Sequence, residues 1–182
     1  MRALEFPVCI FDLRTGVLCS KCERKIREGE LTSDDLEIMR LLVDLEKKFP
    51  QLSSLVYYRT LKIAPYLFVF FIDRSLSSLS KSVEAELRNA LSEKTGLKVR
   101  LLEIRKDWNA FLQNLVAPAR VLTVNKVWLP DQTTELRVLV DDEKLLTAPS
   151  SVLSEVVKKM MNLSVSFDFQ RKVRQPYTRS VG

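Results

Sequence analysis

The sequence predicts an α+β fold built from two copies of one supersecondary unit, behind a short segment that contains all the cysteines. The first observation is the order of apolar periodicities, which is helical, then strand-like twice, then helical and strand-like again. The second is that this order occurs twice along the chain. The third is that Pro65 and Pro130 occupy corresponding turns between the paired strands of the two copies.

The first copy begins with a helix over residues 33–49. Thr32 or Ser33 is suited to cap it, acidic residues follow in its first turn, and Pro50 ends it. Residues 55–63 alternate as a strand, and residues 66–72 are apolar on both faces, which predicts a central strand. Ser80 is expected to cap a helix over residues 80–94 that Gly96 terminates, before a last strand over residues 97–104.

The second copy repeats these steps. Asp107 is expected to cap a helix over residues 107–116, which Pro118 ends. Strands are predicted over residues 121–129 and 134–140, a helix over 151–162 and a final strand over 163–169. The predicted organisation is therefore an N-terminal cysteine segment (1–31), a first unit (32–104), a second unit (105–170) and a basic tail (171–182).

Composition excludes several classes of protein. Apolar residues make up 46% of the chain and charged residues 29%, as in ordinary soluble domains. No apolar run approaches the roughly 18–20 residues that span a bilayer, and the N-terminus lacks a secretory apolar region, so we expect a cytoplasmic protein without a membrane partner. The absence of histidine argues against histidine-dependent hydrolysis and zinc catalysis. Without a nucleotide-binding glycine loop either, we expect no enzyme and no small-molecule substrate.

Cys9, Cys19 and Cys22 form a candidate zinc site. Cys19 and Cys22 have the CxxC spacing of a common zinc half-site, and structural zinc takes four ligands. Because no histidine is present, the fourth ligand would be a carboxylate such as Asp12 or Glu23, a water, or a group from another chain. Two alternatives remain open: a disulfide between two of the cysteines, or the remnant of a zinc knuckle that has lost its fourth ligand.

The net charge is +6, and the excess lies toward the C-terminus. Residues 105–182 contain twelve basic and eight acidic side chains, and no acid follows Asp168. A basic excess raises the expectation of a nucleic-acid partner. Four side chains of the tail are candidate phosphate contacts, namely Arg171, Lys172, Arg174 and Arg179. The alternative is a terminus without a binding role.

The order helix, strand, strand, helix, strand, with a loop before the second helix, resembles a type II KH domain. Two such units in tandem resemble the paired KH domains of the NusA transcription factor family, in particular its short archaeal members. Residues 119–140, from Ala119-Arg-Val-Leu-Thr to Leu139-Val140, are similar to the stretch that enters the second KH unit of that family. The resemblance implies a non-enzymatic RNA-binding protein that modulates transcription elongation or termination.

The chain departs from that family in the loop that contacts RNA. KH domains carry a GxxG loop that allows close approach of the nucleic-acid backbone. Neither residues 73–80 nor 141–149 contain a glycine, and the second loop carries Asp141, Asp142 and Glu143, which repel phosphate. In the first loop Arg74 and Lys81, with the serines between them, are the remaining candidates for RNA binding. The alternative is that these serines only cap the helix.

Losing both glycine loops also favours a different function. The two units would then serve as a protein-interaction scaffold that docks on RNA polymerase or on a ribosomal particle. The basic excess favours RNA as the direct partner, whereas the missing loops favour the scaffold.

Overall fold

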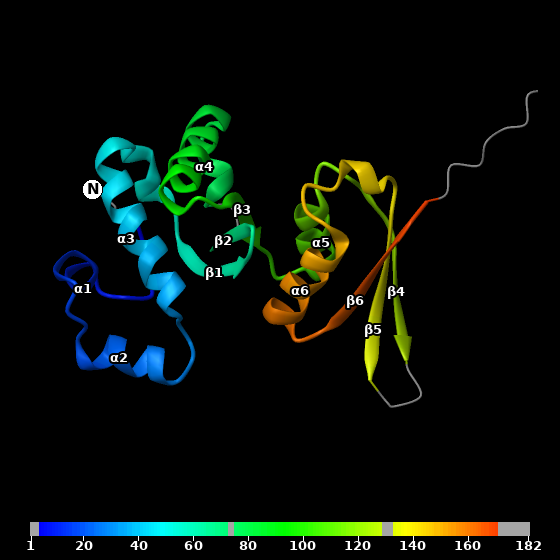
Figure 1. Cartoon of the computed structure of the whole chain (residues 1–182), viewed down its shortest axis with the longest axis horizontal. Helices are drawn as coiled ribbons and strands as arrows, with labels where there is room; N and C mark the ends of the chain where they lie inside the picture. The colour runs from blue at the N-terminus through cyan, green and yellow to red at the C-terminus, as the bar shows by residue number, and fades with distance from the viewer. Residues whose placement is uncertain (1–3, 73–74, 129–132, 171–182) are drawn as a thin grey trace, which may run out of the picture. The chain divides into compact units, whose positions relative to one another are not determined.

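The computed structural model describes residues 4–72, 75–128 and 133–170, and it confirms a mixed α+β architecture. The chain divides into two compact units, Met1–Leu115 and Val116–Gly182, and each contains one three-stranded sheet (Figure 1). Among the described residues, no helix has both the length and the apolar character required to cross a bilayer.

The first unit opens with three helices, α1 (Ile10–Thr15), α2 (Ser20–Arg27) and α3 (Ser33–Lys48). Helix α3 begins at a capping box, in which the Thr32 hydroxyl accepts from the Asp35 amide and the Asp35 carboxylate accepts from the Thr32 amide. A 3-10 turn, η1 (Pro50–Ser54), follows it. The sequence predicted α3 but neither α1 nor α2, which are short helices around the cysteines.

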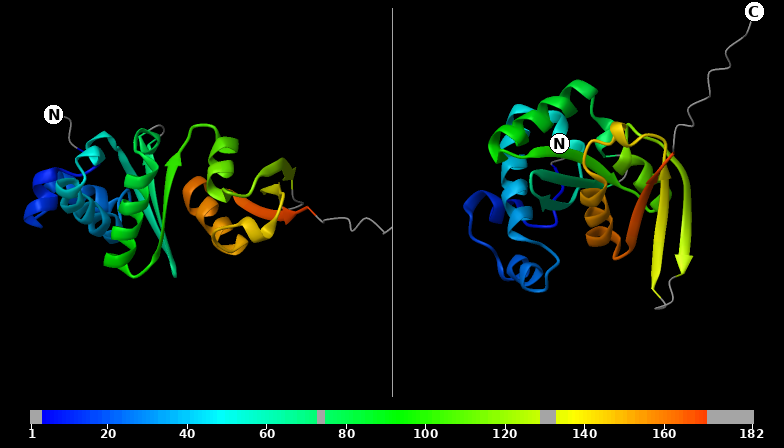
Figure 2. Two further views of the ribbon diagram at one scale, coloured as in Figure 1. Left: turned by 90° about the horizontal axis from the view of Figure 1, so that it is seen from above. Right: turned by 45° about the vertical axis from the view of Figure 1, so that its right-hand side comes forward.

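Strands β1 (Tyr57–Ile63), β2 (Tyr66–Ile72) and β3 (Lys98–Ile104) form the sheet of the first unit in the order β1-β2-β3. β1 and β2 pair antiparallel, and β2 and β3 pair parallel. The chain crosses from β2 to β3 through η2 (Leu76–Ser78) and α4 (Lys81–Thr95). As predicted, Ser80 caps α4, and Gly96 ends it in the left-handed conformation. α4 lies along one face of the sheet (Figure 2).

The core of the first unit lies on both faces of β2. Leu67, Val69 and Phe71 point into one cluster with apolar residues of α3 and α4. Phe68 and Phe70 are also fully buried, and the Phe70 ring lies 6.2 Å from Phe111 of α5 (Trp108–Val116). The expectation that residues 66–72 form a central, covered strand is therefore confirmed.

A β-bulge between Tyr57 and Arg59 interrupts β1. The alternation predicted for residues 55–63, with an interruption at Arg59, places Tyr57 and Thr60 on opposite faces, and that placement is wrong. The bulge brings both side chains inside, where Tyr57 is 3% exposed and Thr60 is 2% exposed. Such bulges redirect side chains on the bulged strand. The displaced Tyr58 remains 44% exposed.

The bulge is organised around a buried carboxylate. Asp35 is fully buried, and its Oδ1 accepts from the Tyr57 hydroxyl and the Thr60 amide, each at 2.6 Å. Its Oδ2 accepts from the amide and the hydroxyl of Thr32, each at 2.8 Å. Burial, followed by the charge of Asp35, raises the pKa of Tyr57 well above its ordinary value. The carboxylate thus joins the start of α3 to the bulged strand.

The second unit has β4 (Val121–Trp128), β5 (Thr134–Val140) and β6 (Ser164–Phe169) in the order β4-β5-β6. β4 and β5 pair antiparallel, and β5 and β6 pair parallel. The crossover runs through η3 (Glu143–Leu145) and α6 (Ser150–Met161). Leu153, Val156 and Val157 of α6 are buried, as the helical periodicity predicted.

The predicted elements and the observed ones differ by one or two residues at their ends. The placement of α5 is less simple. The repeated order assigns α5 to the second unit, which was predicted to begin at residue 105, whereas spatial compactness places the division after Leu115. α5 lies at this division because Phe111 packs on Phe70 of the first sheet, while the chain enters β4 shortly after it.

Candidate metal centre

The three cysteines and one aspartate gather around α1 and α2. Cys9 precedes α1, Asp12 lies in its first turn, Cys19 is the N-cap of α2, and Cys22 lies in the first turn of α2. The left-handed Gly16 ends α1 and lets the chain turn back, so that the two helix starts converge. Each residue offers one ligand atom, and these four atoms lie within 4.8 Å of one another.

Asp12 and Cys22 are buried, Cys19 is partly exposed and Cys9 is exposed. The Asp12 Oδ2 accepts from the Cys19 amide at 2.9 Å. This bond orients the carboxylate, as hydrogen bonds to ligating carboxylates do in general. All three cysteines are free thiols, so the disulfide alternative does not describe this structure.

Burial and hydrogen bonds together determine the protonation states within the cluster. Burial raises the pKa of the Cys22 thiol to about 12, and its hydrogen bond to Asp12 contributes to the rise. The Cys19 amide, followed by the Cys22 and Cys19 thiols, lowers the pKa of Asp12. Without a metal, the cluster therefore holds a carboxylate beside a protonated thiol, and a cation that binds there must displace the thiol proton.

The donor set fits a four-coordinate thiolate-rich site. Tetrahedral zinc with Zn–S bonds of about 2.3 Å places its sulfur ligands about 3.8 Å apart. Ligand atoms within 4.8 Å of one another are close to that spacing already. Of the two carboxylates considered from the sequence, the structure brings Asp12 into the cluster, whereas Glu23 is exposed outside it.

The loop predicted to contact RNA uses most of its serines internally. The amide and the hydroxyl of Ser77 both donate to Glu103 Oε1, at 2.8 and 2.9 Å. The Ser75 hydroxyl donates to the Ile72 carbonyl, and the Ser80 hydroxyl accepts from the Val83 amide. Ser80 thus caps α4, as the alternative expected, whereas Ser75 and Ser77 bond to groups outside that cap.

Of the remaining candidate RNA contacts, the described part of the chain includes Lys81. Lys81 is exposed at the start of α4. Arg74 and the four basic residues of the tail, Arg171, Lys172, Arg174 and Arg179, lie outside the described residues. Their assignment remains a prediction.

The structure also reveals exposed aromatic side chains that the sequence reasoning did not single out for binding. Trp128 at the end of β4 is 70% exposed, and the ammonium of Lys126 lies 4.7 Å from its ring centroid. Tyr58 is exposed on the bulge of β1. Aromatic residues in a predicted strand are usually expected to be buried in the core. Only the structure shows which of these rings are exposed.

Neither protein-family models nor curated proteins give a match to this chain. Among solved structures, one described as "Crystal structure of APE1850" is similar, with a TM-score of 0.55 over 77% of this chain and 100% of that chain. The two sequences are 12% identical, so this similarity concerns the fold alone.

Proposed function

We propose that this chain is a non-enzymatic RNA-binding protein built from two KH-like units of the kind found in NusA-type transcription factors. The observation that carries the proposal is the duplicated topology. In both units an antiparallel strand pair leads through a helix to a third strand parallel to the middle one. A helix precedes each strand pair along the chain, and this order of elements resembles that of a type II KH domain.

RNA binding in this proposal does not use a glycine loop. The first loop directs Ser77 toward Glu103, and in the second loop Asp142 caps η3 through the Lys144 amide. RNA is instead contacted by basic side chains and by exposed rings, on which bases stack without sequence preference. The exposed Trp128 with Lys126 beside it is a pair of this kind.

Titration of the whole chain with single-stranded and structured RNAs at increasing salt tests the proposal. Binding at micromolar concentration or tighter, with log affinity falling linearly with log salt, is the expected result. Charge reversal of Arg74 and Lys81 should weaken binding and flatten its salt dependence. An absence of binding even at low salt contradicts the proposal and favours the scaffold that docks on RNA polymerase or a ribosomal particle.

The second part of the proposal is that Cys9, Asp12, Cys19 and Cys22 hold a structural zinc ion. Three thiolates and a carboxylate are ligands that zinc accepts, and four of them leave no open position for catalysis. The ion would tie α1 to α2 in a segment too short to bury a core of its own. Its role is therefore to order the N-terminal segment.

Substitution of the two acidic residues tests the ligand set. Asp12→Ala should lower zinc affinity at least tenfold in competition with a chromophoric chelator, because it removes one of four ligands. Glu23→Ala is the matched control, since it deletes an exposed carboxylate of the same segment and should leave the affinity unchanged. Equal affinities for the two variants contradict Asp12 as a ligand.

A further inference from the structure

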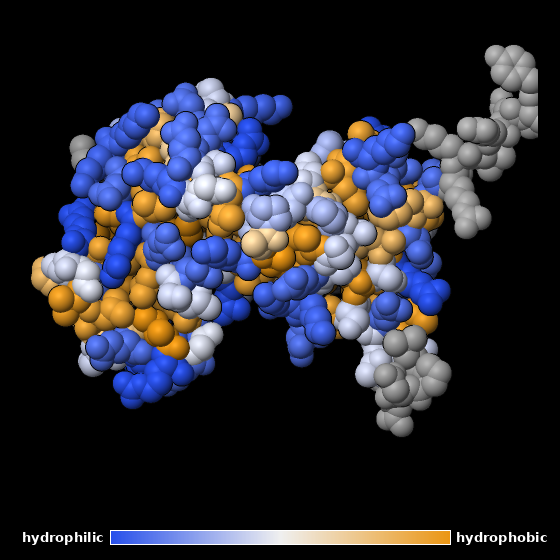
Figure 3. All heavy atoms as spheres, viewed as in Figure 1, coloured by the Kyte–Doolittle hydropathy of each residue, from blue (hydrophilic) through white to orange (hydrophobic). Residues whose placement is uncertain are grey.

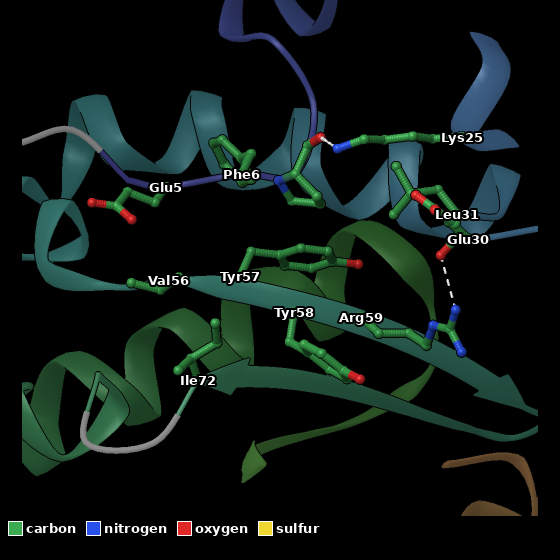
Figure 4. A pocket seen from close by; sticks show the side chains of 11 residues that line it. Glu5, Phe6, Lys25, Glu30, Leu31, Val56, Tyr57, Tyr58, Arg59 and Ile72 are labelled. Carbon is green, nitrogen blue, oxygen red and sulfur yellow. Dashed lines mark hydrogen bonds between the residues drawn. The ribbon is translucent and has the colours of Figure 1, made fainter. Parts of the chain in front are cut away.

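A hollow of about 410 Å³ lies where the bulged part of β1 faces the N-terminal segment. Three segments line it: residues 5–7 before the metal cluster, Lys25, Glu30 and Leu31 in and after α2, and residues 56–59 of β1, with Ile72 beside them. Its volume falls within the range of small-ligand sites. Figure 4 shows these side chains converging from the separate parts of the first unit.

The walls of the hollow are largely aromatic and aliphatic. The rings of Phe6 and Tyr57 are 6.1 Å apart at one wall, and Leu31 is buried nearby. Tyr58, in contrast, is 44% exposed and is one of the residues that line the hollow (Figure 4). An exposed ring over an apolar floor is a surface on which a planar ligand stacks.

Two cations are held at the same end of the hollow (Figure 4). Lys25 donates to the Pro7 carbonyl at 2.7 Å, and Arg59 donates to the Glu30 carbonyl at 2.8 Å. Both acceptors are neutral main-chain groups, so these bonds fix the side chains without cancelling their charges. Lys25 and Arg59 are the two cations that line the hollow, and Glu5 and Glu30 are its two acids.

A second hollow of about 560 Å³ continues past Tyr58 and Ile72, which line both. It is bordered by Ile104 and by Lys106, an exposed cation that follows β3. The ring of Tyr58 thus belongs to two neighbouring hollows, each with an apolar wall and a cation. This alternation of ring and positive charge suits consecutive nucleotides of a single strand, in which bases and phosphates alternate.

We propose that the hollow between Tyr58, Arg59 and Lys25 binds single-stranded RNA, with a base stacked on the Tyr58 ring and a phosphate at the Arg59 and Lys25 side chains. This inference rests on the proposed RNA-binding function and assigns it a place in the first unit. The site needs no glycine loop, because side chains rather than main-chain amides contact the strand. The bulge of β1 supplies it by turning Tyr58 outward.

The metal cluster and this site are physically linked. Pro7 lies two residues before Cys9, and Lys25 lies three residues after Cys22. Their hydrogen bond joins the segment that precedes the cluster to the segment that follows it. An ion held by the four ligands therefore also positions Lys25 at the hollow.

The test uses the whole chain and a fluorescent oligouridine, with affinity measured over a range of salt. Tyr58→Ala should weaken binding about tenfold, whereas Tyr58→Phe, which keeps the ring, should bind as the native chain does. Arg59→Gln should weaken binding and reduce the magnitude of the salt slope by about 0.7, the value for one lost phosphate contact on a single strand. Arg88→Gln is the matched control, since it removes the same charge from an exposed position on α4 that does not line the hollow.

The outcomes separate this inference from the proposed function. Native chain that binds RNA, with Tyr58→Ala and Arg59→Gln no weaker than Arg88→Gln, overturns this site while leaving the RNA-binding function intact. Equal weakening in Tyr58→Ala and Tyr58→Phe overturns stacking as the mode of contact. Native chain that fails to bind RNA at low salt overturns the proposed function and this site together. Circular dichroism and melting of each variant exclude unfolding as the cause of a loss.

Discussion

The two units share one topology but cover their sheets differently. In both, the middle strand sends one set of apolar residues toward the crossover helix: Leu67, Val69 and Phe71 in β2, and Leu136, Val138 and Val140 in β5. The register supports this equivalence, since Leu67 pairs with Val99 and Leu136 pairs with Val165. The opposite faces differ, because Phe68 and Phe70 are buried where the second unit has Arg137, which is exposed, and Leu139, which is half-buried.

The two units therefore expose different surfaces although their strands have the same order. The first unit buries both faces of its sheet and also carries the cysteine segment with α1 and α2. Apolar side chains gather over α1 and toward α2 in Figure 3, and Phe11 and Val17 are each more than 70% exposed there. The second unit keeps a mixed polar sheet face instead. Identical strand order therefore does not imply an identical binding surface.

The largest expected difference is in the stability cost of substitutions on the sheet face opposite the crossover helix. Phe70→Ala should lower the free energy of unfolding of the first unit by about 4 kcal/mol, because a fully buried ring in contact with Phe111 is lost. Leu139→Ala, at the corresponding position of the second unit, should cost less than about 1 kcal/mol. Urea denaturation of both variants measures the contrast. Similar losses would show that the two faces are equally covered.

The next largest expected effect concerns Asp35, the buried carboxylate of the first unit. Asp35→Asn should lower the free energy of unfolding by about 3 kcal/mol, because it replaces acceptors of four hydrogen bonds with a group that is half donor. Asp34→Asn is the control, since Asp34 is partly exposed and forms only a loose ion pair with Lys62 at 3.9 Å. Its cost should stay below about 0.5 kcal/mol. Equal costs would contradict the structural role of Asp35.

Removal of the metal should affect the first unit alone. Zinc at a hundred times its dissociation constant contributes about 2.7 kcal/mol to the state that binds it. Adding a strong chelator should therefore increase hydrogen exchange in residues 4–31 and lower the melting temperature of the first unit. Residues 116–170 should exchange at an unchanged rate. Protection that is identical with and without chelator would contradict a structural ion.

The smallest expected effect is a pH dependence through Glu103. Burial alone would raise the pKa of Glu103, but hydrogen bonds from Ser77 and Arg105 outweigh burial and lower it. A carboxyl whose folded pKa lies below its unfolded value of about 4.3 stabilises the fold above that pH, and this contribution is lost as the pH falls through the folded pKa. Glu103→Gln should therefore lose less stability than the native chain between pH 6 and pH 3. An unchanged acid sensitivity would remove Glu103 from this account.

Local residues determine most of the fold, and the sequence therefore predicted it. Thr32, Ser80 and Gly96 cap helices where the sequence placed them, and the apolar run of β2 is the middle strand of its sheet. The bulge at Tyr58 was not predicted, because it depends on the contact between Asp35 and Thr60, which are far apart in sequence. The sequence also left the identity of the proposed fourth metal ligand undecided, because that choice depends on tertiary contacts. Asp12 and Glu23 are chemically alike, and only the meeting of α1 with α2 distinguishes them.

The metal content of the native chain tests the account most directly, since the ion is expected to order the N-terminal segment and to position Lys25 at the hollow. The protein would be purified without chelator and its metals counted against protein by elemental mass spectrometry and by native mass spectrometry. The account predicts about one zinc ion per chain, and loss of that ion in a Cys22→Ser variant, which lacks one of the three thiolate ligands. Less than half a zinc ion per chain, with no other divalent metal in its place, would contradict it.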